Sequence, residues 1–263
     1  MNKNAFQNVK LAKGEMKVYD FGSVKLHAYK TNDFIDDEVF VVEKDGRAVV
    51  LESPCFFDNN KELAEYLKSV EVAGMLVSYH AAGGTFLPDV PKYATQNAVD
   101  YARNGGGSAL IHQFTGAFGE IFDPALHEIT HVIAEGRITI GGIDFVIRQT
   151  EEAFNVEIPE INAVYTHMLG HDCHSIVAGA GHADAMIAEL RTYMERGYDL
   201  ILTSHYTPED LKDARIKIDY LENLKKIAAD AKSADDFKAE VGKRYPQYSG
   251  QNYLDMTAGF FFA

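Results

Sequence analysis

Two histidines that directly follow apolar runs are the residues best placed to do chemistry in this chain. His80 comes after Gly74–Tyr79 and just before a Gly-Gly pair, and His205 comes after Leu200–Ser204. Such runs predict buried strands, and a polar side chain at the carboxyl end of a strand commonly faces a ligand crevice. Imidazole nitrogens bind zinc, so both positions indicate a metal site. The alternative is a histidine that only hydrogen-bonds its own turn.

A second group of metal-binding side chains lies in the segment Gly170–His174. Within four residues it offers the carboxylate of Asp172 and the imidazoles of His171 and His174, all of which suit zinc. Glu152 follows the predicted strand Ile143–Gln149 and could supply a further carboxylate. The alternative is a polar surface loop in each case.

The sequence lacks two other common kinds of site. It has no G-x-S-x-G segment of a nucleophilic serine, and neither Gly83-Gly84 nor Gly105-Gly106-Gly107 continues into the G-K-[ST] of a phosphate-binding loop. Cys173 and His174 are adjacent, and adjacent side chains on a strand point to opposite faces, so they are a poor nucleophile–base pair.

The order of these segments resembles the metallo-β-lactamase superfamily. The strand, His80 and Gly83-Gly84 are similar to the corner where the family carries H-x-H-x-D-H, here reduced to one histidine. Thr150–Glu160 is similar to the T-E-A-P…P-E segment of the alkylsulfatase-like branch, and Leu200–His205 resembles the late strand with the last histidine ligand. The resemblance implies an α/β fold, a four-layer αββα sandwich.

The resemblance also implies a reduced metal site. Asp172 falls where the family has its metal-bridging acidic residue, so the expected ligands are His80, Asp172 and His205, with His171 and Glu152 as further candidates. Asp172 and His205 would carry the catalysis, with Asp172 orienting the metal-bound water. Three ligands suffice for one catalytic zinc but not for two ions. We therefore expect at most one ion, zinc, with manganese and iron as alternatives.

Length and charge bound the remaining questions. The 263 residues predict a single domain, 1–263, with a C-terminal helical extension at about 207–263 that begins at Thr207-Pro208. The chain has 25 Lys and Arg but 39 Asp and Glu, which gives a net charge of −14. Nucleic acid and anionic membranes are therefore unfavourable partners. Without an apolar stretch of about 20 residues or a signal peptide, we expect a cytoplasmic protein. The oligomeric state is open.

Two functions agree with these observations. The first is a metal-dependent hydrolase with a mononuclear or empty site, acting on a small ester or sulfate ester. The second is a non-catalytic protein of the same fold that binds a small molecule or a protein, either in the crevice or on the aromatic segment Phe114, Phe118, Phe122.

Overall fold

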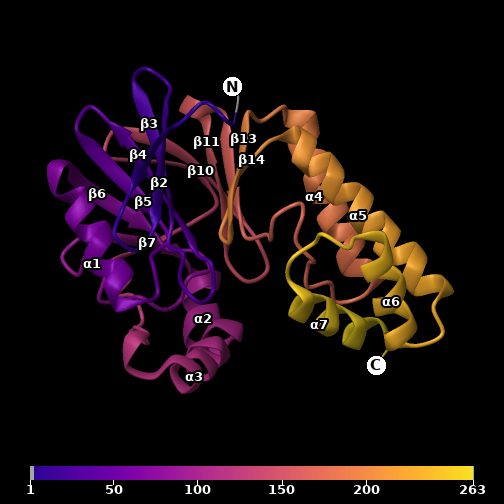
Figure 1. The fold of residues 1–263 in the computed structure, drawn as a ribbon. Coiled ribbons are helices and arrows are strands. Elements are labelled where there is room, and N and C mark those ends of the chain that lie inside the picture. The colour runs from indigo at the N-terminus through magenta and orange to yellow at the C-terminus, as the bar shows by residue number, and fades with distance from the viewer. Residues whose placement is uncertain (1–2, 263) are drawn as a thin grey trace. The chain divides into compact units, whose positions relative to one another are not determined.

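The chain divides into two compact units, and the first one contains nearly all of two β-sheets (Figure 1). The structure is a computed structural model that describes residues 3–262. The first unit runs to His167 and includes Leu202–Pro208, and the second consists of Met168–Ile201 and the chain from Glu209 onward. Each unit is considered by itself below.

The larger sheet has eight strands whose spatial order follows the chain. Its first five strands pair antiparallel, and pairing is parallel from β5 to β8. Asp45 and Gly46 connect β4 to β5 with φ of 51° and 75°, the left-handed pair that a two-residue hairpin needs, and Asp-Gly between two apolar runs is the sequence signal for such a turn. The strands are β1 (Gln7–Lys10), β2 (Glu15–Asp20), β3 (Val24–Lys30), β4 (Glu38–Lys44), β5 (Arg47–Leu51), β6 (Glu71–Leu76), β7 (Lys92–Thr95) and β8 (His131–Ile133).

The smaller sheet has six strands in the order β14-β13-β12-β11-β10-β9. Its inner face packs on the larger sheet, since the rings of Phe40 and Tyr165 lie 6.0 Å apart and Ser78 Oγ donates to the carbonyl of Phe154. The strands are β9 (Gly136–Ile140), β10 (Ile143–Gln149), β11 (Phe154–Ile158), β12 (Ala163–Thr166), β13 (Leu200–Thr203) and β14 (Tyr206–Glu209). Apolar side chains of both sheets are fully buried between them.

Three α-helices belong to the first unit: α1 (Phe57–Tyr66), α2 (Gln96–Asn104) and α3 (Gly106–Phe118). Leu63 of α1 is buried in the apolar core of the larger sheet. Thr95 ends β7 and also caps α2, because its hydroxyl accepts from the amide of Ala98. The aromatic residues of α3 pack around Phe56 and Phe122.

The second unit is helical, with α4 (Ala180–Arg196), α5 (Leu211–Asp230), α6 (Ala234–Arg244) and α7 (Gln251–Phe262). Helices α4 and α5 contact each other along their apolar faces. The predicted helix start at Thr207 is wrong. Thr207 and Pro208 lie in β14, and α5 begins only at Leu211.

The reason for this late start is a stronger cap further along the chain. The Asp210 side chain accepts hydrogen bonds from the amides of Lys212 and Asp213, and the Asp213 carboxylate accepts one from the Asp210 amide. Pro208 is compatible with β14, since that strand ends the sheet and needs no partner on its outer side.

Within residues 3–262, no helix combines the length and the apolar character needed to cross a membrane. Whether the whole chain acts as the single domain that its length predicts, with a helical extension from about residue 207, stays a prediction.

Candidate metal centre

Three histidines meet where three strands of the first unit end. His80 follows β6, His167 follows β12 and His205 follows β13. Their ring centroids are 5.0 Å apart for His167 and His205, 5.8 Å for His80 and His205, and 6.3 Å for His80 and His167. One ring nitrogen from each lies within 4.8 Å of the other two. Two of these residues, His80 and His205, are predicted from the sequence as ligands, and the structure brings them together.

In two of these rings an oxygen acceptor fixes the proton on Nδ1. The Nδ1 of His80 lies 2.9 Å from the carbonyl oxygen of Ser53, and that of His205 lies 3.3 Å from the carbonyl oxygen of Ile35 and 3.2 Å from Asp37 Oδ1. Carbonyl and carboxylate oxygens can only accept, so Nδ1 carries the hydrogen and the lone pair is on Nε2. This is the arrangement that metal-binding histidines adopt.

The tautomer of His167 follows from a chain of hydroxyl groups. Tyr165 donates its hydroxyl proton to Glu52 over 2.7 Å, so it accepts from Ser204 Oγ at 2.6 Å. Ser204 has then used its one proton and accepts from His167 Nδ1 at 2.8 Å. His167 therefore also presents Nε2 as a lone pair, which makes three free Nε2 atoms in one group.

Glu52 organises the loop that carries His80. Its carboxylate accepts from the backbone amides of Ser78, Tyr79 and His80 at 3.0, 2.8 and 3.1 Å, and it is completely buried. Its φ of 66° is in the left-handed region, an uncommon conformation for a glutamate. The sequence analysis missed this residue, although an acidic side chain directly after an apolar strand is a signal that could have found it.

The buried side of the group carries Asp37 and Cys55. The side chain of Asp37 is 1% exposed, and neither of its oxygens has a hydrogen-bond partner of good geometry. Its Oδ1 lies 3.9 Å from His80 Nε2, itself buried without a partner. Burial opposes ionisation of Asp37, but His80 and His205 outweigh it and lower the pKa of that carboxyl. Burial alone would lower the pKa of His80, yet Asp37 and Glu52 raise it.

These donors fit a metal ion. Ligands about 2.0–2.2 Å from a tetrahedral zinc are roughly 3.4 Å from one another, and the 3.9 Å between Asp37 Oδ1 and His80 Nε2 is close to that separation. Buried polar atoms without partners are costly in a folded protein. A cation between Asp37 and the Nε2 atoms would satisfy them.

The other predicted ligands lie elsewhere. Glu152 is an exposed residue between β10 and β11, outside the grouped donors of residues 3–262. Asp172 is exposed and belongs to the second unit, as does His171. The assignment of these three residues to a metal site stays a prediction.

His171 belongs to a group of its own. Its Nδ1 lies 2.6 Å from Glu209 Oε1 and its Nε2 lies 3.6 Å from Asp213 Oδ1. The hydrogen bond to Glu209 raises the pKa of His171. This imidazole is therefore already engaged by carboxylates of its own unit.

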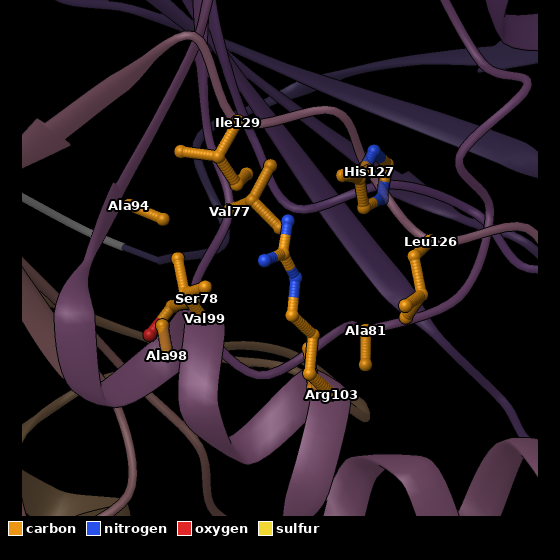
Figure 2. A pocket seen from close by; sticks show the side chains of 11 residues that line it. Val77, Ser78, Ala81, Ala94, Ala98, Val99, Arg103, Leu126, His127 and Ile129 are labelled. Carbon is orange, nitrogen blue, oxygen red and sulfur yellow. The ribbon is translucent and has the colours of Figure 1, made fainter.

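A small cavity of about 20 Å³ lies beside the loop of His80, between α2 and His127 (Figure 2). Arg103 extends from α2 toward Val77 across this space. His127 Nε2 donates to the carbonyl of Ala82, its Nδ1 is buried without a partner, and burial lowers its pKa to about 3. The volume suits about one water molecule, so this cavity is too small for a substrate.

Comparison with solved structures decides the fold. A sec-alkyl sulfatase, PisA1, matches 88% of this chain with a TM-score of 0.62 at 13% sequence identity, and a metallo-β-lactamase from Erythrobacter litoralis matches 82% with a TM-score of 0.57 at 12% identity. The chain has the metallo-β-lactamase fold. The predicted α/β class and the resemblance to this superfamily are thus confirmed at the level of the fold.

Coverage differs between these two structures. The chain matches the whole of the Erythrobacter metallo-β-lactamase but spans about half the length of the alkyl sulfatase, 48% of it. No protein-family model matches the sequence, and no curated protein does. The function of this metallo-β-lactamase-fold chain must therefore be inferred from its own residues.

Proposed function

We propose that the chain is a metal-dependent hydrolase whose single ion is bound by Nε2 of His80, His167 and His205. The observation that carries the proposal is that all three Nδ1 atoms have acceptors in the protein, which leaves three Nε2 lone pairs, in a group where one ring nitrogen of each residue lies within 4.8 Å of the other two. Three imidazoles with an open fourth position are a known catalytic zinc set. Zinc is the proposed ion, and manganese and iron are the alternatives.

A bound ion would polarise a substrate oxygen and lower the pKa of its water to about 7. The protein's own residues prepare this chemistry. Glu52 holds the amides around His80, and the Ser204 hydroxyl holds the ring of His167. Asp37 supplies a buried negative charge that favours a cation at this place.

The two sides of the group differ in access. Asp37, Cys55 and His80 are buried, whereas the His205 side chain is 21% exposed and His167 is exposed. Tyr79 stacks on the ring of His167 at 4.5 Å. A substrate would therefore approach from the side of His167 and His205.

The proposed substrates are small esters and sulfate esters. The fold that this chain shares with a sec-alkyl sulfatase and a metallo-β-lactamase supports hydrolysis as the reaction class. Both kinds of ester would be open to attack by a water that such an ion activates. The choice between them is left to the experiment.

Hydrolysis of p-nitrophenyl acetate and p-nitrophenyl sulfate by chelated and zinc-loaded protein tests the proposal. We expect turnover that needs the ion and that falls at least about a hundredfold in His167→Ala, with His112→Ala, an exposed histidine of α3, as the matched control. Absence of metal-dependent turnover of either ester would contradict it, as would full activity of His167→Ala.

A second function is favoured by a separate cavity. About 450 Å³ of space lies beside Phe34 and Phe56, with Asp33, Lys61 and Ile121 among its other lining residues. This is within the range of small-molecule sites. It supports the alternative of a non-catalytic binding protein, which the same assays would favour if zinc binds and no ester is hydrolysed.

A further inference from the structure

Cys55 completes a second set of donors around His80. Sγ of Cys55, one carboxylate oxygen of Asp37 and one nitrogen of His80 all lie within 4.8 Å of one another. All three residues are buried, with exposures of 5%, 1% and 6%. The cysteine follows β5 in the segment that also contains Glu52 and Ser53, both of which hold the loop of His80.

The unpaired atoms in this set point to a ligand. Nε2 of His80 is buried without a hydrogen-bond partner, and neither oxygen of Asp37 has one of good geometry, although Oδ1 lies 3.2 Å from His205 Nδ1. An imidazole lone pair and a carboxylate oxygen both bind cations, and neither can satisfy the other without a proton or an ion between them. Sγ of Cys55 lies within 4.8 Å of both of these ligand atoms. A set of sulfur, nitrogen and oxygen donors is typical of zinc or iron sites and not of magnesium or calcium sites.

We propose that Cys55 is a thiolate ligand of the ion at His80, which would be bound by sulfur on its buried side and by imidazole on its exposed side. The inference rests on the proposed metal centre and adds the identity of its ion. Binding replaces the S–H bond of Cys55 with a sulfur–metal bond and releases one proton to the buffer. The thiolate selects zinc, iron(II) or cobalt(II) over manganese.

X-ray absorption of the zinc-loaded, full-length protein tests this assignment directly. We expect one sulfur neighbour at about 2.3 Å beside nitrogen and oxygen neighbours at about 2.0–2.1 Å. The chain has two cysteines, and both are buried and form no disulfide, so Cys173→Ser is the matched control for Cys55→Ser. The sulfur shell should persist in Cys173→Ser and disappear in Cys55→Ser.

Cobalt(II) gives a second readout that needs no activity. The wild-type protein and Cys173→Ser should show a near-ultraviolet sulfur-to-cobalt charge-transfer band that Cys55→Ser lacks. Cys55→Ser should also bind zinc at least about tenfold more weakly, while manganese affinity changes little.

The failures of the two proposals are distinguishable. If zinc in the wild-type protein has only nitrogen and oxygen neighbours, Cys55 is not a ligand, and the proposal of a three-histidine centre is unaffected. Absence of any bound ion overturns both. If Cys55→Ser does not fold, the wild-type spectrum together with that of Cys173→Ser still decides the question.

Discussion

At the scale of single residues, the candidate site depends on where each imidazole keeps its proton. Ser53, Ser204 and Ile35 provide the acceptors for the three Nδ1 atoms, and they lie far apart in the sequence. The sequence could predict His80 and His205, because each follows an apolar run. It offers no motif for His167 or Asp37, and their proposed roles emerge only where separate strands end at the same place.

Shared ligation of one ion by His80 and His205 predicts strongly non-additive effects. Each single change to Ala should lower zinc affinity by a similar factor, and the double variant should lose little more, because the first change already removes the site. Competition titration with a chromophoric chelator measures all three affinities. Additive losses would show separate sites. Asp172→Ala in the same assay tests the sequence-based ligand, and unchanged affinity would remove Asp172 from the set.

The four hydrogen bonds accepted by Glu52 predict a large stability loss when its charge is removed. Glu52→Gln exchanges one acceptor oxygen for a donor amide that faces buried donors, which should lower the free energy of unfolding by roughly 1–3 kcal/mol. Urea unfolding measures this loss. Glu65→Gln, at an exposed ion pair with Lys68, is the control and should be almost neutral. Equal stability of the two variants would contradict the anchoring role.

At the scale of elements, strand ends and tight turns position the site. The sequence predicts the strands that precede the histidines and the Asp45-Gly46 hairpin, because apolar runs and turn residues are local signals. The sequence places the start of α5 too early. Thr207 and Asp210 are both possible N-caps, and only the position of β14 at the edge of the sheet decides in favour of the capping box at Asp210. Local signals thus locate an element better than they locate its boundary.

Close approach of two loops makes Gly83 irreplaceable. Its φ is +86°, and a Cβ there would lie 2.2 Å from the carbonyl oxygen of Pro54. Gly83→Ala should therefore lose more than the roughly 1–2 kcal/mol of left-handed strain alone. Gly142 isolates that strain, since its φ is +81° with nothing within 4 Å of the added Cβ. Thermal unfolding should place Gly83→Ala clearly below Gly142→Ala, and the reverse order would refute the packing of these loops.

At the scale of the whole molecule, the two units have different chemical character. The first contains the β-sheets and the three-histidine group, and the second is helical with a carboxylate-bound histidine of its own. The resemblance in sequence order was sufficient to predict the fold, because the order of strands and helices is a property of the whole chain. It does not select among the candidate ligands, because the proposed three-histidine set differs from the superfamily pattern residue by residue.

The pair of His171 and Glu209 predicts how the second unit responds to pH. Because the pKa of His171 is raised on folding, the imidazolium stabilises the protein fully below its unfolded pKa of about 6.5, and this stabilisation is lost as pH rises through the folded pKa. The stability difference between wild type and His171→Gln should thus shrink from pH 5.5 to pH 9, as urea unfolding would measure. A difference that grows with pH would contradict the pairing.

The zinc content of the protein after chelation, reloading and removal of free metal tests the central claim most directly. A single centre at His80, His167 and His205 requires about one zinc per chain in the wild-type protein and much less than one in His80→Ala, with His112→Ala retaining the full amount. Elemental analysis that finds no zinc in the reloaded wild-type protein, or finds two ions per chain, would contradict the account.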